Sequence, residues 1–301
     1  MRFRTGYTLN FLAPLPRGFA MPLQVQIAEY TFRLDGLDDV RTSAIAVVEG
    51  SVNVGGLTAR EGPRPLDGTA PDRGIFVPEQ AAMGQFLSSM AHTLSFIMDI
   101  PIRYASRLDM EELIPETPDE ECHLRTLGTS NVYKLLTAIP RVRSIHMPQV
   151  DDEVFATILR KEPGIALYAQ ALLLQQTTAV FGELWKVLES AFNAKDGALL
   201  RYLADFGPSK ELGFTMAEFK ELLVIRGRAS HAESRSGIKE LRAVRDEVEQ
   251  RLGRLKCLVE QVVVTKKTWG TRTLETERLT PISSFIGPNG EVVLFTRMGG
   301  D

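Results

Sequence analysis

The residues best suited to chemistry in this sequence lie in one short polar stretch, Arg226 to Gly237. It reads Arg-Gly-Arg-Ala-Ser-His-Ala-Glu-Ser-Arg-Ser-Gly, with three arginines, one histidine and three serines in twelve residues. Arginine presents a planar fork of donors that matches the oxygens of a phosphodiester. Histidine titrates near neutral pH and transfers protons. This combination is suited to activating a ribose 2′-hydroxyl and stabilising the charge that builds on phosphorus, with no metal ion required.

Five polar residues of this stretch have a predicted role. Arg226 is predicted to bind the scissile phosphate and His231 to act as acid and base, while Arg228, Ser230 and Arg235 support substrate binding. A structural interpretation competes: Arg226 and Arg228 would cap the C-terminus of the preceding helix, where positive charge is favoured, and His231 would only complete a loop. Residue types by themselves favour this structural interpretation.

Signatures of other catalytic classes are missing from the sequence. It contains no GxxxxGK[ST], GxGxxG, HExxH or GxSxG pattern. The two cysteines, Cys122 and Cys257, have no CxxC or Cys/His ligand spacing, so neither a zinc site nor a disulfide framework is expected. We therefore expect no metal and no cofactor.

The elements around the polar stretch are predicted to be helices. One helix should begin at Thr215, because Thr215-Met-Ala-Glu218 has the spacing of a capping box, and Gly227 should end or bend it. The stretch then leads into a last helix from about Ser236 to Val264, whose apolar residues recur every three or four positions. A long helix over about 164–193 and a short one over about 199–206 complete a four-helix bundle.

A mainly antiparallel sheet with one helix is predicted for the N-terminal domain, residues 1–150. Alternating or β-branched runs indicate strands at 23–27, 30–34, 44–48 and 51–56. The helix is expected over about 78–99 and must stop before Pro101, since residues before proline avoid the α region. An acidic, proline-bearing connection is expected at 114–121, and the domain boundary is placed within 140–152.

The predicted fold class is α+β, with domains at 1–150, 151–265 and 266–301. The last of these is expected to form strands at 265–273 and 291–297, with a turn at 287–290, that extend the N-terminal sheet. No apolar run reaches the length of a membrane span or resembles a signal peptide, so no membrane association and a cytoplasmic location are expected. A net charge of −3 gives no support for nucleic-acid binding by the chain as a whole.

The helical half resembles the HEPN superfamily. The resemblance rests on the long helix at Tyr168–Phe192, the Arg-x4-His element that leads into the last helix, and the bundle around them at 160–265. The superfamily motif, an arginine and a histidine separated by four to six residues, maps onto Arg226 and His231. A β-containing N-terminal region is similar to the ApeA-type branch, as is the stretch Leu94-Ser-Phe-Ile-Met-Asp-Ile-Pro-Ile.

The resemblance implies a bundle that forms a homodimer, which brings two motifs together for metal-independent cleavage of RNA. Active members usually carry a polar residue directly after the arginine, where this chain has Gly227. Three functions therefore stay open: an RNA-directed HEPN-like protein, as an endoribonuclease in defence or stress; a non-catalytic dimeric interaction or sensor module of the same fold; and a metabolic accessory protein without a site. A dimer in which Arg226 and His231 face a shared cleft of positive potential would favour the first. Those side chains held in local caps, with a cleft elsewhere, would favour the second.

Overall fold

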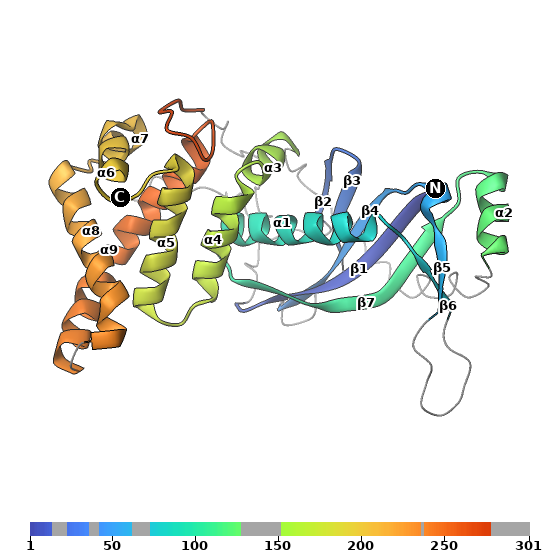
Figure 1. Ribbon diagram of the computed structural model, residues 1–301, viewed down its shortest axis with the longest axis horizontal. Coiled ribbons are helices and arrows are strands. Elements are labelled where there is room, and N and C mark those ends of the chain that lie inside the picture. The colour runs from blue at the N-terminus through green and yellow to red at the C-terminus, as the bar shows by residue number, and fades with distance from the viewer. Residues whose placement is uncertain (14–22, 36–41, 62–72, 128–151, 236–237, 278–301) are drawn as a thin grey trace, which may run out of the picture. The chain divides into compact units, whose positions relative to one another are not determined.

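The computed structural model describes residues 1–13, 23–35, 42–61, 73–127, 152–235 and 238–277 of the chain. Its fold class is α+β, as predicted, and the chain divides into two compact units (Figure 1). The sheet unit comprises Met1–Ala91 and Arg103–Asp152, and the helical unit comprises His92–Ile102 and Glu153–Asp301.

A sheet of five strands in the order β2-β3-β4-β1-β7 is the centre of the sheet unit. Its strands are β1 (Arg2–Phe11), β2 (Leu23–Ile27), β3 (Tyr30–Asp35), β4 (Ser43–Ser51) and β7 (Ile102–Ile114). The register aligns Thr5 of β1 and Phe32 of β3 with Val48 of β4, and all three side chains are buried. Because side chains alternate along a strand, the residues next to Thr5, Phe32 and Val48 on each strand lie on the opposite face of the sheet.

The helix α1 (Gln80–Met98) contributes its first turns to the core of the sheet unit. Met83 and Leu87 are buried, and the ring of Phe86 packs 5.1 Å from the ring of Tyr30 on β3. The helix ends at Met98, before Pro101, which confirms the helix predicted at about 78–99.

Three predictions for the sheet unit were wrong or incomplete. The strand expected at 51–56 is absent, because β4 ends at Ser51 and Val54–Gly56 form a 3-10 turn. In this turn the side chain of Asn53 accepts a hydrogen bond from the backbone N–H of Gly55. The connection expected at 114–121 contains the start of α2 (Pro118–Thr126), capped by a reciprocal box of Thr117 and Glu120. The strand β7 and the small ladder of β5 (Thr58–Glu61) with β6 (Arg73–Phe76) were not predicted.

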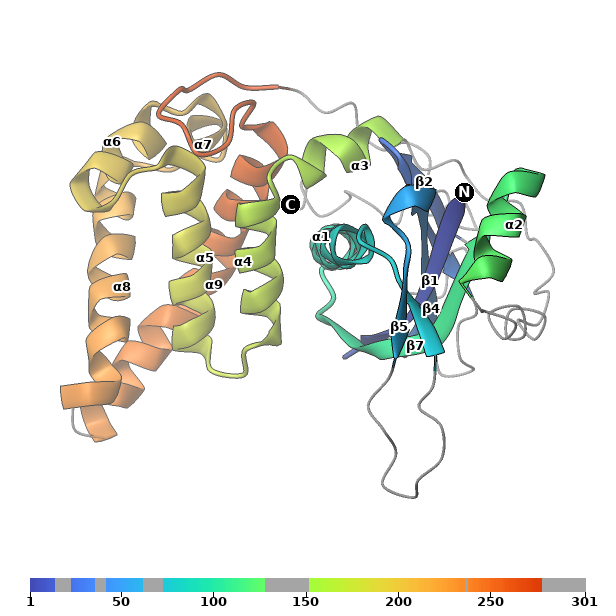
Figure 2. The same ribbon diagram turned by 45° about the vertical axis from the view of Figure 1, so that its right-hand side comes forward.

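The helical unit is built around four long helices: α4 (Glu162–Leu173), α5 (Thr177–Phe192), α8 (Met216–Arg235) and α9 (Ile238–Thr265). Shorter helices precede or connect them: α3 (Asp152–Leu159), α6 (Asp196–Asp205) and α7 (Gly207–Glu211). Figure 2 shows α4, α5, α8 and α9 running alongside one another. Their shared core is formed by large side chains that are fully buried: Tyr168, Phe181, Trp185, Phe192 and Phe219.

The long helix predicted at 164–193 is instead two helices, and this prediction was wrong. The backbone becomes extended at Leu174 and Gln176, and α5 then returns alongside α4. Apolar residues recur on both sides of this break, and no glycine or proline stands at it, so the sequence carries no local signal for a helix end. The turn is stabilised by the packing of the two helices rather than by a local breaker.

After α9 the chain forms a loop, Lys266–Glu277, here called the C-terminal strap. The strand predicted at 265–273 is absent from this described segment, which contains a single antiparallel bridge between Lys266 and Thr276. Trp269 packs against Gly164, where a Cβ atom would lie only 1.9 Å from its ring, and its Nε1 donates to Ser190. The run expected to form a strand at 291–297 lies outside the described residues.

Candidate functional site

As far as Arg235, the polar stretch that begins at Arg226 lies within the helix α8, not between two helices as predicted. The backbone of α8 is helical to Arg235, so Gly227 neither ends the helix nor caps it. An interior glycine costs roughly 1 kcal/mol relative to alanine, and two buried neighbours, Ile225 and Ala229, offset it through packing. The candidate site is therefore a helix surface with fixed angular positions.

The start of α8 is the one that the capping spacing predicted. The hydroxyl of Thr215 accepts a hydrogen bond from the backbone N–H of Glu218 at 3.2 Å. The carboxylate of Glu218 accepts a bond from Arg254 Nε on α9 at 3.0 Å. The apolar face of α8 then follows at helical spacing, with Phe219, Leu222 and Ile225 buried.

Arg226 lies on the side of α8 that faces α5. Its Nη2 is 3.5 Å from Oε1 of Glu189, at the limit of hydrogen-bonding distance, and its side chain is 32% exposed. Glu189 is more deeply buried, with 11% of its side chain exposed. This ion pair is loose, and among the described side chains it leaves most donors of the guanidinium available to a second anion.

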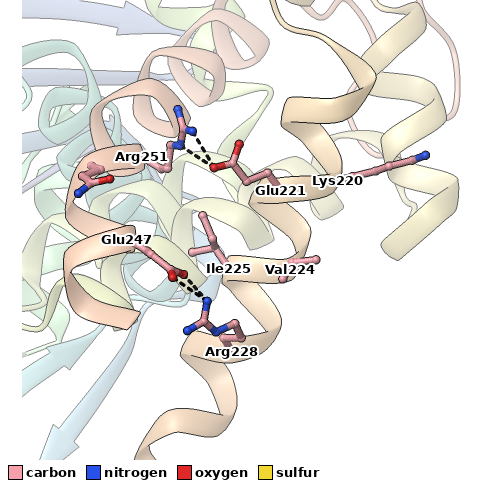
Figure 3. A pocket seen from close by; sticks show the side chains of 8 residues that line it. Lys220, Glu221, Val224, Ile225, Arg228, Glu247 and Arg251 are labelled. Atoms are coloured by element: carbon pink, nitrogen blue, oxygen red, sulfur yellow. Dashed lines mark hydrogen bonds and ion pairs between the residues drawn. The ribbon is translucent and has the colours of Figure 1, made fainter. Parts of the chain in front are cut away.

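Arg228 lies on the opposite side of α8 and pairs with α9. Its Nη1 donates to both carboxylate oxygens of Glu247, at 2.7 and 2.5 Å (Figure 3). Both side chains are about two-fifths exposed. The structural interpretation, in which Arg226 and Arg228 cap the end of the preceding helix, is wrong, because both lie inside α8 and pair with carboxylates of neighbouring helices.

The other predicted site residues follow along α8. The hydroxyl of Ser230 donates to the backbone carbonyl of Arg226 at 2.9 Å, a local bond that satisfies its only proton. The backbones of His231 and Arg235 belong to the helix, and their side chains lie outside the described residues.

Helical geometry sorts the five predicted residues into two stripes. At 3.6 residues per turn, position 231 lies about 140° around the axis from position 226, but only about 60° from position 228. Position 235 is about 20° from position 228. Arg228, His231 and Arg235 therefore share one face, and Arg226 shares another with Ser230.

A shallow hollow of about 420 Å³ lies between α8 and α9, and Arg228 forms part of its wall. A second ion pair, between Glu221 and Arg251 at 2.6 Å, crosses the same hollow (Figure 3). Val224 is 60% exposed there. The lining carries charges of both signs: Lys220, Glu221, Val224, Ile225, Arg228, Glu247, Gln250 and Arg251.

The two carboxylates that form ion pairs with Arg226 and Arg228 were not predicted from the sequence. Glu189 stands among the residues of a helix that was otherwise assigned to the core, and Glu247 belongs to the mixed-charge surface of α9. Mixed charges on a helix surface are usually only solvated, and no local pattern pairs Glu247 with a residue 19 positions earlier. Only the packing of α8 on α9 brings this pair together.

A second group of charges that was not predicted joins Lys161 to the C-terminal strap. Lys161 and Lys266 are buried, and Lys161 Nζ contacts the carbonyls of Val263 and Val264 and the carboxylate of Glu277. Burial, followed by repulsion from Lys161, lowers the pKa of Lys266 to about 8. Across the described ranges, no group of three His, Cys, Asp or Glu side chains is arranged to hold a metal ion.

Comparisons with known proteins identify no relative. No family model matches the sequence, and neither the curated proteins nor the solved structures include a significant match. Among the residues that the structure describes, no helix has the length and apolarity needed to cross a bilayer.

Proposed function

We propose that this protein is an RNA-directed protein of the HEPN type, and that α8 carries a metal-independent site for phosphodiester cleavage. The observation that supports the proposal is that α8 is one unbroken helix through Gly227, with Arg226 loosely paired and partly exposed. Arg226 binds the scissile phosphate, because its free guanidinium donors match phosphate oxygens. His231 moves the proton of the attacking hydroxyl.

The angular separation of Arg226 and His231 favours a site completed by two copies of the chain. Positions about 140° apart on one helix face different directions, so a single phosphodiester is better reached by Arg226 of one copy and His231 of another. A homodimer that brings two α8 helices together supplies both groups.

Cleavage of a mixed RNA pool in EDTA tests this function. We expect wild type to cut and Arg226→Ala/His231→Ala to lose about 10²-fold or more of the rate, as expected for removal of an acid–base group. Arg245→Ala is the control, because Arg245 is exposed on α9 and pairs along its own helix with Glu249. A wild type that folds but cuts nothing contradicts the nuclease.

Mixing the two single variants tests the shared site. If Arg226→Ala and His231→Ala are each inactive but regain cutting when their subunits are exchanged, the site is built from two copies. Activity that is never restored contradicts the two-copy arrangement and leaves the assignment of the two residues to the first experiment.

A non-catalytic interaction module is the second candidate, and a specific observation favours it. Both Arg226 and Arg228 have carboxylate partners on neighbouring helices, which is the arrangement expected of arginines that stabilise a bundle. In this function the hollow beside Val224 binds a protein partner. Absence of both RNA binding and RNA cleavage, together with a stable dimer, would favour this candidate.

A further inference from the structure

We propose that Arg228 binds the RNA backbone and that Glu247 competes with RNA for its guanidinium. This carboxylate therefore limits RNA binding. The inference rests on the proposed function and adds its regulation. A phosphate group and a carboxylate present oxygens of similar geometry to an arginine, so either ligand fits the same donors. Glu247 contacts Arg228 with both of its oxygens and thus takes the place of a phosphate.

The position of Arg228 connects it with the proposed chemistry. It lies one turn before His231 on the same face of α8, whereas Arg226 lies on another face. A phosphate bound by Arg228 is therefore adjacent to the one that is cut. Glu247, which lies on α9, forms an ion pair with Arg228, the arginine that precedes His231 on this face of α8.

The strength of the Arg228–Glu247 pair suits a contact that RNA displaces. Both side chains are about two-fifths exposed, and ion pairs with this much access to water contribute little to stability. After displacement, Glu247 has to share Arg251, which follows four residues later on α9 and already pairs with Glu221.

The chain offers a matched control across the same hollow. Glu221 and Arg251 form a second interhelical ion pair, with similar exposure of both side chains. Neither residue belongs to the Arg-x4-His stretch. Glu221→Gln and Glu247→Gln each remove one negative charge from the hollow, so both weaken general repulsion of RNA equally. Only Glu247→Gln releases Arg228.

Binding to labelled 2′-O-methyl RNA tests the inference, because this polymer has no attacking hydroxyl and stays intact. Fluorescence anisotropy is measured between 50 and 300 mM KCl, concentrations on the order of those over which phosphate contacts change affinity strongly. We expect Glu247→Gln to bind about fivefold more tightly than wild type, the order expected for loss of a competing surface ion pair. The dependence on salt should steepen by about 0.7, one phosphate contact to a single strand.

Two comparisons decide the outcome. The gain from Glu247→Gln must exceed that from Glu221→Gln, and it must disappear in Arg228→Ala/Glu247→Gln, a double-mutant cycle on the pair. Equal gains, or a gain that persists without Arg228, overturn the inference while leaving RNA binding intact. If no variant binds RNA, the proposed function fails and this inference with it. Circular dichroism checks folding, and Glu247→Ala replaces the glutamine variant if that variant unfolds.

Discussion

Lys266 provides the most quantitative test of the structure, through its replacement by methionine. The side chain is fully buried, with its Nζ donating to the carbonyl of Thr273 at 2.6 Å and lying 4.4 Å from the centre of the Phe192 ring. These contacts do not compensate for the loss of water. Burial, and next the charge of Lys161, lower the pKa of Lys266 from its ordinary 10.5 to about 8.

The magnitude follows from this difference in pKa. A change of 2.5 between the ordinary value and about 8 means that the folded state holds the charged form at a cost of about 3 kcal/mol, at 1.36 kcal/mol per unit. Methionine has a similar volume and no charge, so it removes this cost. It also removes the bond to Thr273, a net loss of about 1 kcal/mol. We therefore expect Lys266→Met to raise the free energy of unfolding by about 2 kcal/mol at pH 7.

The sign of the pH dependence is fixed by which state binds more protons. Between the folded pKa of about 8 and the unfolded value of 10.5, the unfolded state holds the proton more tightly, so wild-type stability rises with pH in this window. Below pH 8 the full cost is present, and above pH 10.5 it is gone. The advantage of Lys266→Met should thus shrink to about zero by pH 9.5.

Urea unfolding at pH 7, 8, 9 and 9.5 measures this effect. Tryptophan fluorescence is the signal, because both tryptophans, Trp185 and Trp269, belong to the helical unit. Lys161→Met is the comparison at the neighbouring buried lysine. Burial lowers the pKa of Lys161 as well, but this side chain contacts Glu277 and two helix carbonyls, so its replacement should be less favourable to stability than that of Lys266. A Lys266→Met variant that is less stable than wild type by the same amount at every pH would refute the reasoning.

Two glycines give further tests of local packing. Gly164→Ala places a Cβ atom 1.9 Å from the Trp269 ring, so the C-terminal strap must shift. The melting temperature and the tryptophan emission should then change. The control is Gly182→Ala in α5, which has open space around the new atom and should not weaken the helical unit. Gly227→Ala has nothing within 4 Å of the added atom and should stabilise α8 by up to about 1 kcal/mol in thermal melting. A destabilised Gly227→Ala would mean that α8 does not continue through this position.

Local sequence signals predicted the elements whose boundaries depend on neighbouring residues. Alternation gave the strands β2, β3 and the centre of β4, and Pro101 gave the end of α1. Thr215 gave the start of α8, and apolar spacing gave nearly the full length of α9. In each case the deciding interaction spans a few residues, so the sequence contains it.

Boundaries that depend on tertiary contacts could not be predicted in this way. The break at 174–176 has no glycine or proline, and its extended conformation follows from the return of α5 along α4. The reverse error occurred at Gly227, a residue that signals a helix end but is held inside α8 by buried neighbours. Helix propensities of about 1 kcal/mol decide whether a helix ends at such a position only when tertiary packing favours neither conformation.

The candidate site shows the same division between residue type and geometry. Residue types marked Arg226 and Arg228 as candidate phosphate-binding positions, and in the structure each of them pairs with a carboxylate of a neighbouring helix. No local sequence pattern indicates that the two carboxylates come from the chain itself, because Glu189 and Glu247 are far from the arginines in sequence. Any external phosphate must therefore compete with an internal carboxylate. In the proposed function, the affinity for RNA therefore depends on the carboxylates of α5 and α9 as well as on α8, and substitutions at Glu247 are more informative than those in the arginines alone.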